Sequence, residues 1–361
     1  MVSSPVRREL SFHRDNMQFS IKHLRITTLL FAAIFTPFAA RSTWAKDEPP
    51  SQLVVATWNV EWMYDDDLSD NRSDLSKEQS APTQEFWRTK LTGVASALAA
   101  MGADIVALQE IEGDQTLTAI AAELRQKHHL NYRYAFIPGS DRFTEQDVGL
   151  LFRSGLTQYR RHEQSREMFD SNHYYNISKH LVGEFSWKSI ASRLTVMTVH
   201  LRATAEAEDF RIRQARLARI WLEPQIDKGE DVILLGDFNS EHPVGDNTGD
   251  MLELAGTGSP TANGTGHVTP PLVDLLVYAP AAQRKSHLIL PRAFDRILVS
   301  QSLIDDGPGK DWVFKQIEIR SDLVVRGKPD GQEHWDNRLT MSLDELDTSD
   351  HFPLVATFEL K

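Results

Sequence analysis

The sequence contains no cysteine among its 361 residues. This absence excludes disulfide bonds, thiolate nucleophiles and cysteine-ligated zinc, so any bound metal must be held by oxygen and imidazole ligands. Positive charge is also scarce, because 39 Lys and Arg stand against 51 Asp and Glu and the net charge is −12. Such a chain is not expected to grip duplex DNA through a broad basic face, although acidic ligands in a nuclease site would themselves contribute to this charge.

Long hydrophobic runs are confined to the N-terminal end. Met17 is the expected translation start, with Lys22 and Arg25 as a positive n-region and an apolar run over residues 26–40. A small-x-Ala cleavage site follows at Thr43-Trp44-Ala45. This order is typical of a signal peptide and predicts export to the periplasm or secretion.

The chain therefore divides into an N-terminal extension with signal peptide, 1–45, and a mature domain, 46–361. A single membrane anchor is the alternative, but Pro37 interrupts an apolar run shorter than the roughly 20 residues that span a bilayer, so no stable span is expected. Residues 1–45 hold six Lys/Arg and two Asp/Glu, and removing them changes the net charge from −12 to −16. The mature chain has no repeats and no long Pro/Gly linker, which favours one domain. A monomer is expected, although the sequence does not indicate the oligomeric state.

Apolar runs and helical spacings predict more strands than helices. Strands are expected over Val54–Val60, Ile105–Leu108, Tyr132–Ile137, Asp147–Arg153, Leu181–Trp187, Leu194–Leu201, Val232–Leu235, Phe294–Val299 and Phe352–Leu360, and helices over Phe86–Met101, Thr116–Lys127 and Phe210–Leu222. The mixed order indicates stacked β-sheets covered by helices on the outside, an α+β sandwich.

Three further segments have a biased composition. Asp65–Glu85 is acidic and lacks apolar periodicity, which predicts a surface loop; a calcium site there is the alternative, but the spacing lacks the glycine and terminal glutamate of an EF-hand. Gly245–Pro270 is rich in Gly, Thr and Asn and is also expected to be a loop. The four arginines of Phe210–Leu222 favour a solvated helix face over a nucleic-acid patch.

Candidate chemistry begins at Asp231–Glu241, "DVILLGDFNSE". The apolar run predicts a buried strand, and Asp237 and Asn239, two positions apart, would project to one face at its end. A carboxylate beside an amide suits phosphate chemistry. A strand that simply ends in an Asx turn is the alternative for this stretch alone.

Other strand ends carry the same kinds of side chain. These polar ends are Asn59 with Glu61, Glu110, His200, Asp237 with Asn239, Asp295, and Asp350 with His351. Taken singly, each has an ordinary structural explanation, since a lone histidine is usually a hydrogen-bonded core residue. Because buried polar groups are costly without partners, so many of them are expected to pair with one another or with a bound ion.

The motifs "TWNVEW", "ADIVALQEIE", "VHLRA", "GDFNSE", "FDRILVS" and "SDHFPLVATFEL" occur in this order. Together they resemble the endonuclease/exonuclease/phosphatase superfamily of metal-dependent phosphoesterases, over residues 52–361. The resemblance implies a deoxyribonuclease I-like fold of two mixed β-sheets flanked by helices. It also implies a site at one end of the sandwich that uses Mg²⁺ or Mn²⁺, with Glu110 as the principal metal ligand and Asn59 and Asp350 lining the same site.

The resemblance further implies catalytic roles. Asp237 matches the position that orients or deprotonates the attacking water, and Asn239 the amide that contacts the phosphate. His351 corresponds to the imidazole on the scissile phosphate, with Asp295 as its orienting carboxylate. His200 matches a second imidazole found in the deoxyribonuclease, sphingomyelinase and inositol-phosphatase branches, which argues against abasic-site repair.

Two positions depart from the family pattern. Secreted deoxyribonucleases place an arginine where this chain has Lys179 followed by His180, and a lysine is a point charge without the bidentate fork. The partner that should hold His200 is also open, with Gln146 and Asp147 as candidates.

The resulting hypothesis is an exported, metal-dependent phosphodiesterase of deoxyribonuclease type, with DNA or RNA as its substrate. The alternative is a phosphatase or phospholipase-C-like hydrolase acting on a phospholipid or a small phosphorylated molecule, which the acidic composition favours. A binding module without catalysis is a third hypothesis, which the complete set of motif residues disfavours. Family resemblance indicates a phosphoester but does not name the substrate.

Overall fold

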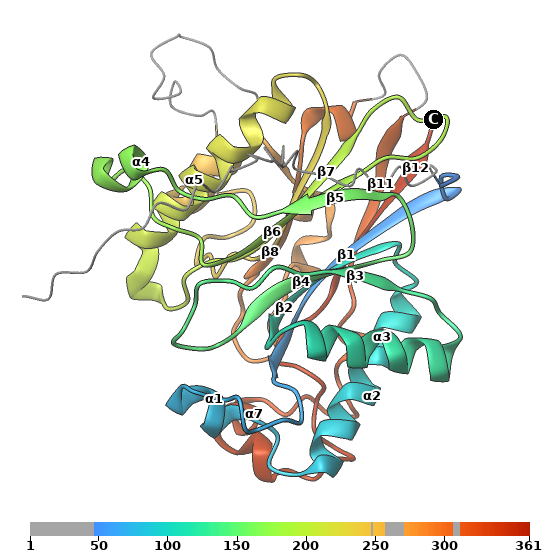
Figure 1. Ribbon diagram of the computed structural model, residues 1–361, viewed down its shortest axis with the longest axis vertical. Coiled ribbons are helices and arrows are strands. Elements are labelled where there is room, and N and C mark those ends of the chain that lie inside the picture. Colours follow the sequence, from blue (N-terminus) through green and yellow to red (C-terminus); the bar gives the residue numbers. More distant parts are fainter. Residues whose placement is uncertain (1–46, 247, 257–270, 306–310) are drawn as a thin grey trace, which may run out of the picture. The chain divides into compact units, whose positions relative to one another are not determined.

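Two six-stranded β-sheets make up the centre of the structure (Figure 1). The computed structural model describes residues 47–246, 248–256, 271–305 and 311–361, and the predicted signal peptide lies outside these residues. The strand order is β11-β12-β1-β2-β4-β3 in one sheet and β5-β6-β7-β8-β10-β9 in the other. The predicted sandwich of two mixed sheets is confirmed.

The elements have the following bounds. The strands are β1 (Gln52–Met63), β2 (Ile105–Ile111), β3 (Arg133–Ala135), β4 (Asp147–Phe152), β5 (Leu156–Arg160), β6 (Lys179–Phe185), β7 (Leu194–His200), β8 (Asp231–Asp237), β9 (Val273–Asp274), β10 (Asp295–Val299), β11 (Trp312–Ile319) and β12 (Leu354–Leu360). The helices are α1 (Asp74–Gln79), α2 (Gln84–Met101), α3 (Asp114–His128), α4 (Arg166–Ser171), α5 (Glu208–Ile226), α6 (Gly249–Ala255) and α7 (Gln332–Asn337).

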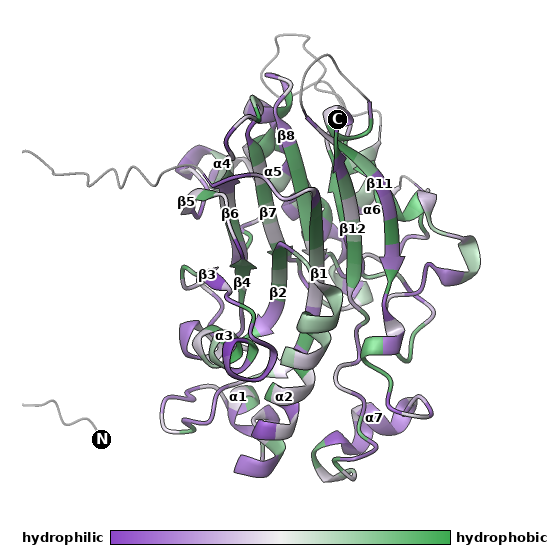
Figure 2. Ribbon diagram, turned by 90° about the vertical axis from the view of Figure 1, so that its right-hand side faces the viewer, coloured by the Kyte–Doolittle hydropathy of each residue, from purple (hydrophilic) through white to green (hydrophobic). Residues whose placement is uncertain are grey.

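Three hydrophobic clusters fill the spaces between the two sheets and between each sheet and its helices. Alternate strand residues such as Val55 and Ile233 point between the two sheets. Ala56 and its neighbours pack with α2 and α3 on the outer face of the first sheet, while Val232 packs with α5 and α6 outside the second. Each central strand is therefore apolar on both faces, which explains why these strands have continuous apolar sequences and are coloured as hydrophobic in Figure 2.

Strand pairing brings the polar strand ends together. β1 pairs with β2 and β7 with β8 in parallel, while β10 lies antiparallel to β8. The carboxyl ends of β1, β2, β7 and β8 and the amino end of β10 therefore carry the candidate side chains. Gly236 allows close packing here, because it has a φ of 142° and a Cβ at this position would lie 1.9 Å from the carbonyl oxygen of Val199.

The acidic segment Asp65–Glu85 is not only a surface loop, as the sequence predicts. It contains α1, which Ser73 caps by accepting from the backbone N–H of Ser76. Asp65 is buried and accepts from the backbone N–H of Asp67, so it organises a turn. Asp65, Asp70 and Glu112 bring carboxylate oxygens within 4.8 Å of one another, a grouping that an acidic surface often shows without an ion.

The solvated helix face predicted for the arginines of α5 is wrong for two of them. Arg211 and Arg219 are buried. Arg211 donates to the carbonyl of Arg202 at 3.2 Å and lies 3.7 Å from Asp250 on α6. Charge patterning alone does not distinguish such a helix-packing role from exposure, because a guanidinium can be buried when carbonyls and a carboxylate receive it.

Other differences concern short or peripheral elements. The sequence predicts a loop over residues 245–270, but α6 lies within them; residues 247 and 257–270 lie outside the described part of the chain. The edge strands β5, β9 and β11 do not appear among the predicted strands, because edge strands carry polar residues and have weak apolar signals. Among the described helices, none has the length and apolar character needed to cross a bilayer.

Candidate active site

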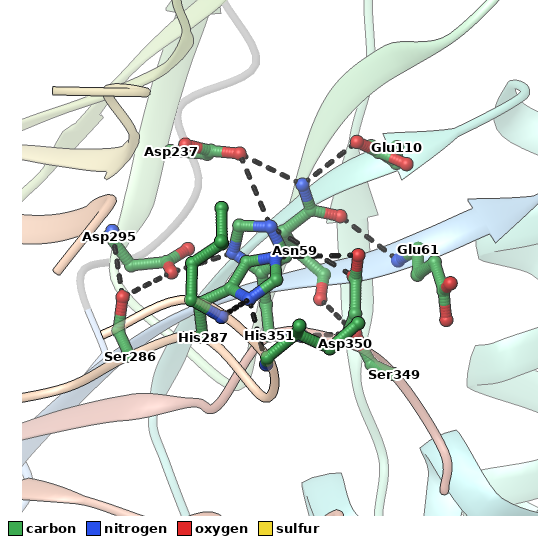
Figure 3. A network of polar contacts seen from close by, with 12 residues as sticks. Asn59, Glu61, Glu110, Asp237, Ser286, His287, Asp295, Ser349, Asp350 and His351 are labelled. Carbon is green, nitrogen blue, oxygen red and sulfur yellow. Dashed lines mark hydrogen bonds and ion pairs between the residues drawn. The ribbon is translucent and has the colours of Figure 1, made fainter. Parts of the chain in front are cut away.

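The candidate side chains converge at one end of the two sheets (Figure 3). Register places His200 directly opposite Asp237 across the β7–β8 pair, and Asp295 opposite Asp237 across β8–β10. Glu110 lies at a bulge in β2 and has a left-handed φ of 61°. A bulge re-aims a side chain, and positive φ in a non-glycine residue stores strain that is common at functional sites.

The Asn59 carboxamide joins two carboxylates that come from different sheets. Its Nδ2 donates to Oε1 of Glu110 and to Oδ2 of Asp237, both at 2.9 Å. Its Oδ1 accepts from the backbone N–H of Glu61. The sequence resemblance implies that Asn59 lines the metal site; the structure shows Asn59 as a donor between two carboxylates, with its oxygen bonded within the chain.

Glu110 is held by two further donors. Its Oε2 accepts from the backbone N–H of Trp62 and from Nε2 of Gln146, each at 2.9 Å. Gln146 in turn accepts from Nζ of Lys179 at 3.3 Å. Gln146 thus positions Glu110, which differs from its predicted contact with His200.

His351 and Asp295 form the closest imidazole–carboxylate pair of the cluster. Nδ1 of His351 lies 2.8 Å from Oδ2 of Asp295, which also accepts from the hydroxyl of Ser286 at 2.7 Å. Burial disfavours the charged imidazole, but Asp295, Asp237 and Asp350 together raise the pKa of His351 well above its usual value. His351 is therefore a cationic donor whose Nε2 faces Asp237 at 3.8 Å.

Asp237 occupies the centre of the cluster and is buried. Burial raises the pKa of the Asp237 carboxyl well above its ordinary value, although the nearby His351 charge acts in the opposite direction. Its Oδ1 accepts from the backbone N–H of Asn239 at 2.8 Å, so the Asx turn considered as an alternative is present as well. One amide hydrogen of Asn239 is used on the carbonyl of Leu201.

His200 completes the cluster as a neutral imidazole. Its Nε2 lies 3.6 Å from Oδ2 of Asp237 and 4.0 Å from Oε1 of Glu110. Burial and then the Lys179 charge hold the pKa of His200 well below its usual value. Its buried Nδ1 has no hydrogen-bond partner among the described residues, and Asp147, the other predicted partner, instead accepts from the backbone N–H of Gly139.

Lys179, which replaces the expected arginine, is buried beside His200. Its Nζ lies 3.1 Å from Oδ2 of Asp141, and the Lys179 charge opposes burial and lowers the pKa of Asp141 to about 2. Because its charge is neutralised within the chain, Lys179 supports the cluster and is poorly disposed to grip a phosphate backbone.

Asp350 is oriented by two ring N–H groups that no sequence motif marks. Nε1 of Trp335 donates to Oδ2 of Asp350 at 2.9 Å. Nδ1 of His287 accepts from the backbone N–H groups of Ile289 and Leu290, so its proton is on Nε2, which faces the same oxygen at 3.6 Å. His287, Asp350 and His351 have the spacing of a metal-binding group, but this tautomer makes His287 a donor.

A second buried cluster ties the site to the C-terminal part of the chain. Glu61 has its carboxylate 2.8 Å from Nε2 of His334 on α7, 3.7 Å from Lys90 on α2 and 3.6 Å from Arg338. Burial opposes the charge on His334, but the bond to Glu61 raises the pKa of His334 to about 8. Glu61 therefore connects the end of β1 to the segment that carries Trp335.

The donor set fits a hard divalent cation. The carboxylates of Asp237, Asp295 and Asp350 surround the cationic imidazole of His351, Glu110 groups with Asp237 and His200, and Oδ1 of Asp295 is buried without a partner among the described residues. Oxygen ligands with excess negative charge are typical of Mg²⁺ or Mn²⁺ sites. The ligand roles of Glu110 and Asp350 stay a prediction.

The sequence thus predicts the strand-end residues but not the side chains that hydrogen-bond to them and hold them in place. Gln146 meets a different partner from the one predicted, while Ser286, His287 and Trp335 follow no strand that is visible in the sequence. A lone serine, histidine or tryptophan carries no spacing signal, so only the folded arrangement reveals these contacts.

Comparisons with known proteins agree with the fold. Residues 56–351 match the model of the Endonuclease/Exonuclease/phosphatase family. A humanized D. rerio TDP2 has a TM-score of 0.52 and 15% identity, covering 86% of this chain and 100% of that chain. A truncated Caenorhabditis elegans TDP2 has a TM-score of 0.51 and 17% identity, covering 85% and 97%.

The human Nocturnin catalytic domain, described with a bound sulfate anion, has a TM-score of 0.50 and 15% identity, covering 87% of this chain and 96% of that chain. No curated protein sequence matches this chain significantly. At such identities the solved structures establish the fold alone, and the match of residues 56–351 to the family model carries the family assignment.

The two ring N–H groups that face Asp350, from His287 and Trp335, lead to a testable prediction. His287→Asn keeps an acceptor for Ile289 and Leu290 but removes the N–H that faces Asp350, and Trp335→Phe keeps the ring but removes its N–H. Each should weaken Mn²⁺ binding about tenfold, as removal of a donor that orients a ligating carboxylate typically does. Calorimetric titration with Mn²⁺ measures the effect, and His173→Asn, at an exposed position, is the matched control. Unchanged Mn²⁺ affinity in both variants would contradict the positioning role.

Proposed function

Because this chain belongs to the endonuclease/exonuclease/phosphatase family of hydrolytic phosphoesterases, we propose that it is a divalent-metal-dependent phosphodiesterase that cleaves nucleic acid. The observation that carries the proposal is the His351–Asp295 pair, 2.8 Å apart, next to a buried Asp237. A cationic donor and a basic carboxylate 3.8 Å apart can act on one phosphate, the donor on a phosphoryl oxygen and the carboxylate on the attacking water. Hydrolysis then needs no serine or cysteine nucleophile.

His351 donates a hydrogen bond from Nε2 to a phosphoryl oxygen. Asp295 holds the imidazole through Nδ1, and the hydroxyl of Ser286 fixes Asp295 in turn. Because the pKa of His351 is raised by the surrounding carboxylates, the imidazole stays charged and stabilises the negative charge that develops on the phosphate.

Asp237 orients the attacking water and accepts its proton. Its two donors, Nδ2 of Asn59 and the backbone N–H of Asn239, fix the carboxylate plane. Burial makes this carboxyl more basic than an ordinary aspartate, which suits a general base near neutral pH. Asn239 has a second amide hydrogen beyond the one used on Leu201, and that hydrogen contacts the phosphate.

Glu110 and Asp350 would hold the divalent cation, with Asn59 and Asp237 beside them. The cation supplies Lewis-acid neutralisation of the phosphate charge. The neutral His200 contributes a second imidazole close to Asp237 and Glu110 without adding a competing positive charge.

Nucleic acid is the favoured substrate because of Trp335. Its side chain is 42% exposed, and its hydrogen bond to Asp350 holds the ring beside the cluster. An exposed, immobilised indole next to a phosphate site suits stacking of a base attached to that phosphate. The net charge of −12 favours the alternative, a phospholipid or small phosphorylated substrate, because it repels long polyanions.

A substrate panel tests the proposal. The mature protein should cleave plasmid DNA, single-stranded DNA or RNA with Mg²⁺ or Mn²⁺, and EDTA should abolish the activity, which gel electrophoresis measures. Turnover of sphingomyelin or inositol phosphates with every nucleic acid left intact would replace the proposal with the alternative. No turnover of any phosphoester would refute both.

Two variants test the assigned roles. Asp237→Ala removes the base and His351→Ala removes the cationic donor, so each should lower kcat by on the order of 10²–10⁴-fold. Asp170→Ala, which removes an exposed carboxylate on α4, is the matched control and should keep the activity. Circular dichroism and thermal melting report whether the fold is retained. More than a tenth of the activity left in either site variant would show that its role is misassigned.

Export from the cytoplasm is also part of the proposal, and it rests on the residues before Lys46. Expression of the full chain should give a product that begins after Ala45 in the periplasm or medium. N-terminal sequencing of fractionated protein measures this. An uncleaved chain in the cytoplasmic fraction would contradict export without affecting the proposed chemistry.

A further inference from the structure

A pocket of about 510 Å³ adjoins the candidate active site on the Asp295 side. Its walls come from residues 241–244, 281–285 and 291–293. Each of these segments runs directly into the cluster: Glu241 follows Asn239 by two residues, Lys285 precedes Ser286, and Ala293 precedes Asp295 by two. Each wall of the pocket therefore lies within two residues, along the chain, of a side chain in the cluster.

The pocket wall is braced by a buried guanidinium. Arg296, on β10, donates from Nη2 to the carbonyl of His242 and from Nη1 to Asp274, both at 2.7 Å. Its Nε donates to the carbonyl of Ala293 at 2.8 Å. Since Arg296 is fully buried, two of the three wall segments are fixed to the same strand that presents Asp295.

The lining is basic in a chain that is acidic as a whole. Arg284, Lys285 and Arg292 line the pocket against a single carboxylate, Glu241. His242 already has its Nε2 2.8 Å from Glu208. With a net charge of −12 over the whole chain, a local excess of positive charge beside a phosphate site favours an anionic ligand.

Two of the cations are oriented without being neutralised. Arg284 donates from Nε and Nη2 to the carbonyls of Ala279 and Val277, at 2.9 and 2.7 Å. Nζ of Lys285 donates to the carbonyl of Leu288 at 2.6 Å, and an ammonium has two further N–H donors. Neutral carbonyls fix the position of a charge but do not cancel it. Within the described part of the chain, Arg292 is the one of these three cations that pairs with a carboxylate, Glu241, at 3.0 Å.

A larger pocket between α2 and residues 322–326 lacks this character. Its volume is about 860 Å³, but its lining balances Arg88 and Arg326 against Glu85 and Asp322. The smaller pocket therefore differs from the larger one in having more positive than negative side chains in its lining. Its wall segments are also the ones that lead into the candidate catalytic residues.

We propose that this basic pocket, which Arg284, Lys285 and Arg292 line, binds the phosphate next to the scissile one in a nucleic-acid strand. The inference rests on the proposed function and makes it more specific. A strand carries further phosphates beyond the one that is cleaved, whereas a single phosphodiester, such as a phospholipid head group joined to its lipid, has none to place there. The pocket thus selects a polymer over an isolated phosphoester.

Charge-changing variants test the proposal by binding and by turnover. Lys285→Gln and Arg292→Gln remove positive charge, and Arg284 is left in place because it supports the loop. Fluorescence anisotropy with a labelled single-stranded 12-mer, in the Asp237→Ala background, gives Kd without hydrolysis. The double variant should raise Kd about tenfold, and the slope of log Kd against log salt should fall by roughly 0.7 for each phosphate that the protein no longer neutralises. Glu241→Gln should have the opposite sign and lower Kd.

A comparison of kcat/KM on two substrates, one with and one without a second phosphate, provides an internal reference. In the otherwise native background, the double variant should show at least a tenfold larger decrease in kcat/KM on the 12-mer than on bis(p-nitrophenyl) phosphate, which has no second phosphate. Arg88→Gln, which removes one positive charge from the other pocket, should leave the ratio between the two substrates unchanged.

The outcomes separate the inference from the proposed function. Equal decreases on both substrates, or an unchanged Kd in the double variant, would overturn the pocket assignment while nuclease activity stands. Tight, pocket-dependent binding of the 12-mer without cleavage would support the pocket and refute the nuclease. Binding to phosphatidylinositol vesicles that the double variant abolishes, with no affinity for the 12-mer, would overturn the nucleic-acid assignment.

Discussion

The hydrogen bonds of the Asn59 carboxamide are the interaction on which the site depends. One amide nitrogen joins Glu110 of the first sheet to Asp237 of the second, so the spacing of the two carboxylates depends on how the sheets pack. A second link lies two residues earlier in β1. Thr57 donates to Gln109 within the first sheet, and Gln109 donates to Thr198 of the second sheet. These buried polar links are costly unless every partner is present, so they specify one relative placement of the sheets.

The second constraint is the excess of buried negative charge around His351. Burial places Asp237, Asp295 and Asp350 around His351, and the described residues provide few other positive charges to offset them. The result is an imidazole that stays charged, since its carboxylate neighbours raise its pKa, and an aspartate that holds a proton more readily than usual. Under the proposed function, a bound cation would lower the cost of this negative charge, and a phosphate would provide the acceptor for the imidazole.

The sequence predicts the elements whose signals are local. Buried strands such as Val232–Leu235 and the helix Phe86–Met101 are visible because apolar periodicity and a C-terminal glycine mark them, and the structure places them in β8 and α2. The strand-end residues are also accessible, because polar groups after apolar runs are costly in isolation. What stays hidden depends on tertiary contacts, such as the tautomer of His287 or the burial of Arg211 against Asp250.

The strands that sequence reasoning misses have a related explanation. β5 and β11 lie at sheet edges, where one side of the strand pairs and the other faces solvent, so their residues need not be apolar. In the same way, the position of Gln146 just before a predicted strand makes it, with Asp147, a candidate partner of His200, whereas Gln146 instead donates to Glu110, which lies at a bulge. The local sequence pattern predicts which polar groups lie near a strand end, but the bulge in the backbone determines which of them are in contact.

The contacts of α7 give the site an unusual dependence on a distant part of the chain. Trp335 bonds to Asp350, and the neighbouring His334 bonds to Glu61, two residues beyond Asn59. One short helix therefore contacts both Asp350 and the end of β1. Under the proposed ligand role of Asp350, thermodynamic reciprocity would make cation binding and the packing of α7 against the site stabilise each other.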